Sequence, residues 1–174
     1  MYFPWVMEGR CYRTMDVALW WAARRDIRKL QRLVQREESA ARTFDVLRSA
    51  PHARPVPQFV RAALALARGD TTAALRRLIP DSSCPGAQQP RAMQFRLLAA
   101  AGRDSAAAWV WDRLYDRRVP QMLERARVAE RLGDRPTAAH YYQFVLEAWL
   151  HADPELQPVV AEARAALRRL GEER

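Results

Sequence analysis

The sequence predicts an all-α protein built as a stack of antiparallel helix pairs. Composition is the first observation, because Ala, Leu and Arg dominate the 174 residues and isoleucine occurs only at Ile27 and Ile79. Ala, Leu and Arg lose little conformational freedom in a helix, whereas strands favour β-branched residues. The second observation is a helix–turn–helix pattern that recurs along the chain. The third is a helix-starting signal, Asp153-Pro154-Glu155, that follows the last copy.

The recurring pattern is a run of Ala and Leu that ends in glycine, followed by a polar residue and a second Ala-rich run. Its copies cover residues 65–78, 98–111, 129–142 and, more weakly, 22–33. The equivalent positions, spaced 44, 33 and 31 residues apart, are Arg25, Gly69, Gly102 and Gly133. We expect each glycine to take the left-handed conformation that ends a helix, and the polar residue after it to start the next helix.

Side-chain size also repeats in the three clear copies. A small residue comes five positions after each glycine and a large apolar residue nine positions after it. These positions are Ala74, Ala107 and Ala138, then Leu78, Trp111 and Tyr142. The small residue lets the second helix pack closely on the first, and the large one lies one turn later on the same face. The first copy departs from this pattern, with Arg25 in place of glycine and Leu30 in place of the small residue.

This Gly/Ala/aromatic signature resembles the tetratricopeptide repeat, whose period is about 34 residues. The resemblance covers roughly residues 12–151 and implies a right-handed stack of about four helix pairs. No copy combines the family's aromatic near the start of the first helix with its terminal proline at the usual distance. Residues 129–170 are also similar to the repeat regions behind some bacterial serine/threonine kinases and transcriptional regulators. The kinase portion itself is absent, since the chain has no glycine-rich phosphate loop, His-Arg-Asp or Asp-Phe-Gly.

We therefore predict one domain, 1–174, with an aromatic N-terminal segment at 1–13, repeats at 14–151 and a capping helix at 154–170. The predicted repeat helices cover about 14–24, 26–48, 56–68, 70–79, 90–101, 104–116, 120–132 and 135–151. The proline-rich stretches 51–57 and 80–90 are interpreted as connections. A final helix fits this scheme because the open end of a repeat stack needs a cap.

Catalysis is not predicted. His52, His140 and His151 are scattered without metal-ligand spacing, so surface or capping histidines are the simpler interpretation. Cys11 and Cys84 form no CxxC motif. We expect no metal and no cofactor. The absence of a secretory signal and of a long apolar run predicts a cytoplasmic protein, and the leading hypothesis below adds a position peripheral to the inner membrane.

The charge is uneven along the chain. Residues 1–120 hold 21 basic and 11 acidic residues, whereas residues 121–174 hold 8 and 9. Helical spacing places one basic stripe on the predicted second helix, consisting of Arg25, Lys29, Arg32 and Arg36. Such a stripe suits an acidic protein surface or an anionic membrane. Nucleic acid is the partner least expected, because no base-reading motif accompanies the charge. A simply solvated helix face is the alternative.

Two further surfaces are candidate binding sites. Tyr2, Phe3 and Trp5 at the N-terminus predict an aromatic anchor for a partner or a membrane interface, or else fold back on the first repeat. The tetratricopeptide resemblance implies a groove with an apolar end at Tyr12 and Phe59 and a cationic end at Arg96, Arg127 and Arg131. That groove would bind an acidic segment unless loops of the chain itself fill it.

These observations favour a non-catalytic protein–protein interaction scaffold. The leading hypothesis is an accessory, membrane-extrinsic subunit that docks on the cytoplasmic face of a larger membrane complex, photosynthetic or respiratory. The expected partners are proteins with acidic or apolar surfaces, an integral membrane complex or an anionic membrane surface. The alternative is a soluble regulatory peptide-binding module of a bacterial signalling system, which would use the groove.

Overall fold

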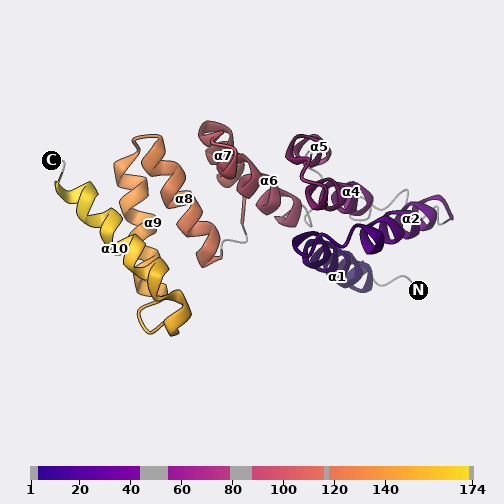
Figure 1. Ribbon diagram of the computed structural model, residues 1–174, viewed down its shortest axis with the longest axis horizontal. Helices are drawn as coiled ribbons and strands as arrows, with labels where there is room; N and C mark the ends of the chain where they lie inside the picture. The colour runs from indigo at the N-terminus through magenta and orange to yellow at the C-terminus, as the bar shows by residue number, and fades with distance from the viewer. Residues whose placement is uncertain (1–3, 44–54, 79–87, 116–117, 173–174) are drawn as a thin grey trace. The chain divides into compact units, whose positions relative to one another are not determined.

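A computed structural model describes residues 4–43, 55–78, 88–115 and 118–172 (Figure 1). This part of the chain consists of α-helices and one 3₁₀-helix and contains no strand, which confirms the all-α prediction. The helices are α1 (Pro4–Ala23), α2 (Ile27–Thr43), α4 (Pro55–Ala67), α5 (Thr71–Arg77), α6 (Gln88–Ala100), α7 (Asp104–Trp111), α8 (Val119–Arg131), α9 (Arg135–Ala148), η2 (Pro154–Leu156) and α10 (Gln157–Glu172).

The chain divides into two compact units, Met1–Met93 and Gln94–Arg174. In the first unit α4 is the central helix, because α1, α2 and α5 all pack against it. Its buried side chains include Phe59 and Val60, and the alanines at 62 and 63 are fully buried. Small residues let neighbouring helices approach α4 closely, and the two large side chains supply much of the apolar area that leaves water.

The second unit is centred on α9, which packs between α8 and α10. Tyr142 of α9 is buried in a cluster with Leu123 of α8 and with Ala163 and Ala166 of α10. An aromatic pair joins α7 to α9. The indole N–H of Trp111 donates to the Tyr141 hydroxyl oxygen at 3.0 Å. The rings of Trp111 and Tyr141 meet edge to face, an arrangement that aromatic pairs favour.

Four helix–helix turns share one backbone conformation. Arg25 has a φ of 53°, and the glycines at the equivalent positions have φ values of 67–81°. In each turn this residue donates its N–H to the carbonyl three positions back, and the next residue donates to the carbonyl five positions back. This is the Schellman pattern, which satisfies the last carbonyls of the preceding helix. The four turns therefore lie where the sequence pattern placed them.

The residue after the turn starts the next helix in three of the four cases. The carboxylates of Asp26, Asp70 and Asp134 accept the backbone N–H three positions on, at 2.8–3.2 Å. Arg103 takes the same position in the third turn and makes no side-chain cap. The residues five positions after the turn are fully buried in all four turns, including Leu30, where the repeat has alanine.

Several helix boundaries differ from the prediction. The first helix begins at Pro4 rather than near residue 14. Proline is favoured in the first turn of a helix, and the single Gly9 costs only about 1 kcal/mol, so the helix continues through this stretch. Helix α7 ends at Trp111 rather than near 116, because Arg113 and Leu114 then donate to carbonyls only three positions back and tighten the turn.

The C-terminal helix also differs, since it was predicted as one helix over 154–170. The structure has a 3₁₀ turn at Pro154–Leu156 and then α10. Pro158 explains the change, because it has no N–H to bond the carbonyl of Pro154. Within the proline-rich stretches, Pro55 and Pro57 belong to the first turn of α4 and Pro90 to the first turn of α6. The predicted end of the second helix near 48 lies outside the described residues.

Candidate functional site

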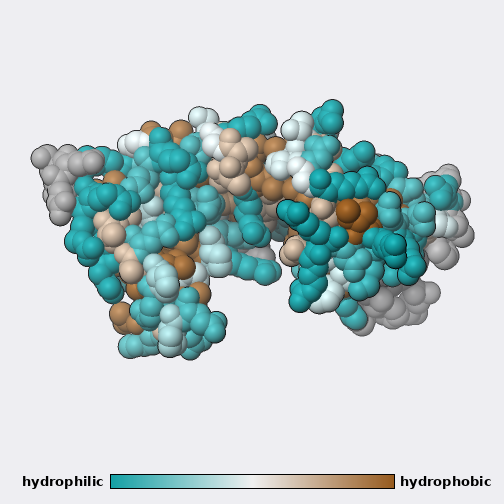
Figure 2. All heavy atoms as spheres, viewed as in Figure 1, coloured by the Kyte–Doolittle hydropathy of each residue, from teal (hydrophilic) through white to brown (hydrophobic). Residues whose placement is uncertain are grey.

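The strongest candidate is the basic face of α2, defined by Arg28, Lys29, Arg32 and Arg36 of the helix and by Arg25 of the turn before it. All five side chains are exposed, whereas Leu30 and Leu33 on the opposite side of the helix are buried. The helix is thus amphipathic in the ordinary way, with its apolar side in the core and its cations in water. Figure 2 shows hydrophilic residues over most of the visible face of α2. The sequence pattern predicted four of the five members, and Arg28 completes the row.

Ion pairs divide the five cations into two groups. The ammonium of Lys29 lies 3.0 Å from the Asp26 carboxylate, and Arg36 lies 2.8 Å from Glu37. The hydrogen bond from the Lys29 side chain lowers the pKa of Asp26 below its ordinary value. Arg25, Arg28 and Arg32 make no ion pair with any described residue. These three guanidinium groups therefore stand outside the ion pairs of the described chain, although Arg32 attracts the Asp26 carboxylate at longer range.

The described carboxylates of α1 and α2 are engaged by other side chains. In addition to Asp26 and Glu37, Glu38 accepts from the Arg61 guanidinium at 2.7 Å. Asp16 on α1 accepts from the side-chain amide of Gln89 at 2.8 Å. These contacts hold the acidic groups in place and leave the arginines available to an external anion.

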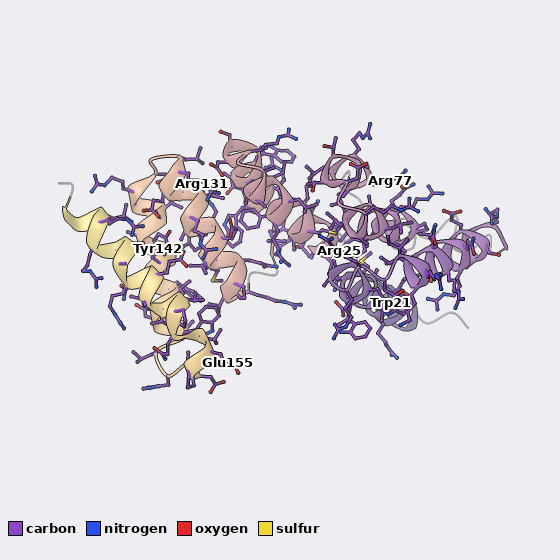
Figure 3. The ribbon with its side chains drawn as sticks, viewed as in Figure 1. Trp21, Arg25, Arg77, Arg131, Tyr142 and Glu155 are labelled. Atoms are coloured by element: carbon purple, nitrogen blue, oxygen red, sulfur yellow. The ribbon has the colours of Figure 1, made fainter. Side chains whose placement is uncertain are left out.

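Aromatic rings adjoin the basic face at the C-terminal end of α1. The Arg24 guanidinium lies 4.0 Å from the centroid of Trp20, and the Lys29 ammonium lies 5.9 Å from that of Trp21. Trp20 is 52% exposed, a large value for so apolar a side chain. Figure 3 labels Trp21 and Arg25 at this end of the helix. We did not predict Trp20 as a site residue, although the Trp20/Arg24 spacing of four residues was a usable signal.

The predicted aromatic anchor is only partly within the described chain. Tyr2 and Phe3 lie outside it. Trp5 and Tyr12 belong to α1 and not to a segment that precedes the first helix, and their side chains are outside the described part.

The apolar end of the predicted groove contains a core residue. Phe59 is 1% exposed among the helices that surround α4, so a ligand reaches its ring only if those helices move. The three arginines of the cationic end all belong to the second unit.

At that end, two of the three predicted arginines bind carboxylates of the chain itself. Arg127 donates to both Glu162 oxygens at 2.7 and 2.6 Å and to Glu124 at 3.1 Å. Hydrogen bonding to Glu162 raises the pKa of Arg127 above its ordinary value. Arg131 binds both oxygens of Asp104 at 3.0 and 2.7 Å. Arg96 is exposed and makes no ion pair with a described residue, so it is the groove cation that remains available.

Sequence reasoning missed a polar network beside these arginines. The Tyr142 hydroxyl donates to one oxygen of Glu130 at 2.7 Å, and Arg169 of α10 donates to the other at 2.8 Å. Burial opposes ionisation of Glu130, but the hydrogen bonds from Tyr142 and Arg169 outweigh it and lower its pKa. Burial, and then the bond to Glu130, raise the pKa of Tyr142. The network holds α10 against α8 and α9 and offers no reactive group. Figure 3 labels Tyr142 and Arg131 in this unit.

One cation of the second unit is buried with two of its nitrogens unbonded. Arg125 of α8 is 8% exposed, and its Nε and Nη1 atoms are buried without a hydrogen bond. Hydrogen bonding with Thr137 is the main cause that lowers the pKa of Asp134, and attraction of the Asp134 carboxylate by the Arg125 charge is a smaller one. The two unbonded nitrogens lose hydration without a hydrogen bond in return, which costs stability.

The described residues contain no group of three His, Cys, Asp or Glu side chains placed to hold a metal ion. Their helices also include none that is both long and apolar enough to cross a bilayer.

Comparison with known proteins adds no relative. No protein-family model, curated protein or solved structure matches the chain.

Proposed function

We propose that this protein is a non-catalytic protein–protein interaction scaffold, an accessory subunit that docks from outside on a larger membrane complex. The observation that carries the proposal is the basic face of α2. Three of its arginines are exposed and make no ion pair with a described residue, while Asp26, Glu37 and Glu38 are bound by Lys29, Arg36 and Arg61. Unpaired guanidinium groups in a row are suited to electrostatic docking on an acidic surface.

The architecture supports the same proposal. Four turns of one conformation, each followed by a fully buried residue five positions on, are what a tetratricopeptide-like array of helix pairs requires. In that arrangement α10 would be the capping helix. Such arrays bind proteins through extended surfaces. A host that converts energy, photosynthetic or respiratory, and a position peripheral to the inner membrane remain part of the proposal.

Charge reversal tests this function. The variant R25E/K29E/R32E/R36E is compared with R68E/R76E/R77E/R103E, which reverses four exposed arginines elsewhere and changes the net charge equally. In membrane fractionation and size-exclusion chromatography of a cell lysate, we expect the first variant to leave the high-mass fraction and the control to remain. The proposed function fails if the wild-type protein itself elutes as a free monomer.

The soluble regulatory module is the second candidate, and it depends on the groove. Arg127 and Arg131 hold internal carboxylates, so a peptide carboxylate must displace Glu162 or Asp104 to reach them. Arg96 is free of that competition. If this candidate is correct, Arg96→Glu abolishes a transient interaction while reversal of the α2 face leaves that interaction intact, as a pull-down with both variants will reveal.

A further inference from the structure

We infer that the corner between α1 and α2, defined by Trp20, Arg24, Arg25, Arg28 and Arg32, binds an acidic helical segment of a partner protein. The inference rests on the proposed scaffold function and names the partner's chemistry. The segment would carry carboxylates at helical spacing together with a large apolar side chain.

The spacing of the cations suits a helix. Arg28 and Arg32 lie one turn apart on the same face of α2, and Arg25 lies in the turn that leads into the helix. Four residues of helix rise about 6 Å. Two acidic residues four positions apart on a partner helix have the same rise, so they can face Arg28 and Arg32 when the helices lie side by side, with a third acidic residue one turn earlier toward the Arg25 end.

The chemistry of the row favours carboxylates. Each guanidinium is a planar fork that binds both oxygens of a carboxylate, as Arg127 does with Glu162 inside this chain. Two acidic residues of this region already have ion-pair partners, since Asp26 pairs with Lys29 and Glu37 with Arg36.

Trp20 supplies the apolar contact. It is 52% exposed, and its neighbour on the same face of α1, Val17, is 39% exposed. The Arg24 guanidinium stacked on the Trp20 ring fixes the ring in place before binding, which lowers the entropy cost of the contact. Tryptophan and arginine are also the side chains that contribute most to protein interfaces.

A lipid surface fits these observations less well. A helix that binds a bilayer inserts a whole apolar face into it. The apolar side chains of α2, Leu30 and Leu33, are buried in the protein. Among described residues of α1 and α2, the large apolar side chains that are well exposed are Val17 and Trp20.

Two probes test the inference with the full-length protein. One is a synthetic helical peptide with Glu at positions i, i+3 and i+7 and a Leu on the same face, followed by fluorescence anisotropy. The other is a phosphatidylcholine vesicle that contains phosphatidylglycerol, followed by co-sedimentation. We expect the wild type to bind the peptide. The affinity of R25Q/R28Q/R32Q should be lower by a factor of about ten or more, because three charge-assisted contacts are lost. The matched control, R68Q/R76Q/R77Q, should bind as the wild type does.

Trp20→Ala distinguishes the corner from a general attraction of opposite charges. It leaves every arginine of the row in place, and we expect about a tenfold loss of peptide affinity because a central tryptophan contact disappears. If Trp20→Ala binds like the wild type, the corner as defined here is overturned.

The remaining outcomes separate this inference from the proposed function. Absence of peptide binding, or equal binding by the triple variant and its control, overturns the inference. Vesicle binding that needs the three arginines, without peptide binding, assigns the corner to lipid and overturns it too, while the scaffold proposal stands. Retention of R25Q/R28Q/R32Q in the wild-type high-mass fraction shows that the host docks elsewhere. A wild type that is monomeric in that lysate removes the proposed function itself.

Discussion

At the scale of single residues, Arg25 occupies a backbone conformation that glycine occupies in the three equivalent turns. A side chain with a Cβ pays about 1 kcal/mol for a left-handed φ, because the Cβ crowds the following carbonyl. Arg25→Gly removes this strain. Glycine also increases the conformational entropy of the unfolded chain, but that cost is smaller than the strain energy removed. We therefore expect the variant to raise the free energy of unfolding by about 0.5 kcal/mol, measured by urea denaturation.

Gly133→Ala is the reverse change and the control for that measurement. An added Cβ at Gly133 meets no atom within 4 Å, so any loss comes from the backbone alone. A destabilisation of about 1 kcal/mol is expected. If Arg25→Gly destabilises the protein, then the Arg25 side chain contributes packing that outweighs the strain. In either case, arginine at this strained position adds a cation to the basic face, which glycine would remove.

Arg125 gives a second prediction at this scale. Replacing a buried guanidinium whose Nε and Nη1 atoms lack a hydrogen bond with an apolar side chain of similar length removes the cost of their lost hydration while it keeps the packing of the methylene groups. Arg125→Met is expected to raise the free energy of unfolding by about 1–3 kcal/mol. Arg168→Met, at an exposed position of α10, should change it by less than about 0.5 kcal/mol. A lower urea midpoint for Arg125→Met than for the wild type would contradict the account.

At the scale of helices, α10 is held by apolar contacts and by ion pairs. Its fully buried side chains against α8 and α9 are the small Ala163 and Ala166. Val159, Leu167 and Leu170 pack against the same cluster. The polar contacts of α10 join Glu162 to Arg127 through two hydrogen bonds and Arg169 to Glu130. Arg135 of α9 adds a hydrogen bond to the Leu170 carbonyl.

This balance predicts that α10 loosens in acid. The pKa of Glu162 is lowered chiefly by its hydrogen bonds with Arg127, and that of Glu130 is lowered as described above. A carboxyl group whose pKa is lower in the folded state contributes stability above its unfolded pKa and loses it as pH falls through the folded value. We expect the unfolding midpoint in urea to drop between about pH 5 and pH 3. Glu162→Gln should flatten the fall and cost about 1 kcal/mol at pH 7. An identical pH profile in both proteins would show that the pair contributes nothing.

The turns between helices could be predicted from the sequence, but the start of α1 and the long-range ion pairs could not. The four turns were predictable because glycine and the aspartate caps act through local backbone chemistry, which is readable without knowing the fold. The start of α1 was missed because the residues after Pro4 carry no apolar periodicity, although a helix tolerates all of them. The ion pairs of Arg127 and Arg131 could not be predicted from the sequence. Their partners Glu162 and Asp104 lie 35 and 27 residues away, and only the packing of the helices brings them together.

At the scale of the whole molecule, the charge of the chain is concentrated in its first part, with 21 basic against 11 acidic residues up to position 120. The composition alone predicted an anionic partner, but not which cations meet it. The structure reduces the candidates, since internal carboxylates occupy Lys29, Arg36, Arg61, Arg127 and Arg131. Arg25, Arg28, Arg32 and the groove cation Arg96 make no ion pair with a described residue, and the position of the first three near Trp20 could not be predicted from the charge of the sequence.

This combination of charge and one exposed ring predicts a specific response to salt. Raising NaCl from about 0.1 M to about 1 M shortens the Debye length from about 10 Å to about 3 Å and screens exposed charges. Binding of the host by the wild type should weaken until it equals that of R25Q/R28Q/R32Q, because the three arginines no longer contribute. The loss caused by Trp20→Ala should persist at 1 M, since an apolar contact is not screened and salt does not weaken it. Titration of each variant at both salt concentrations measures this, and a Trp20→Ala defect that disappears at high salt would show that the ring acts only by positioning Arg24.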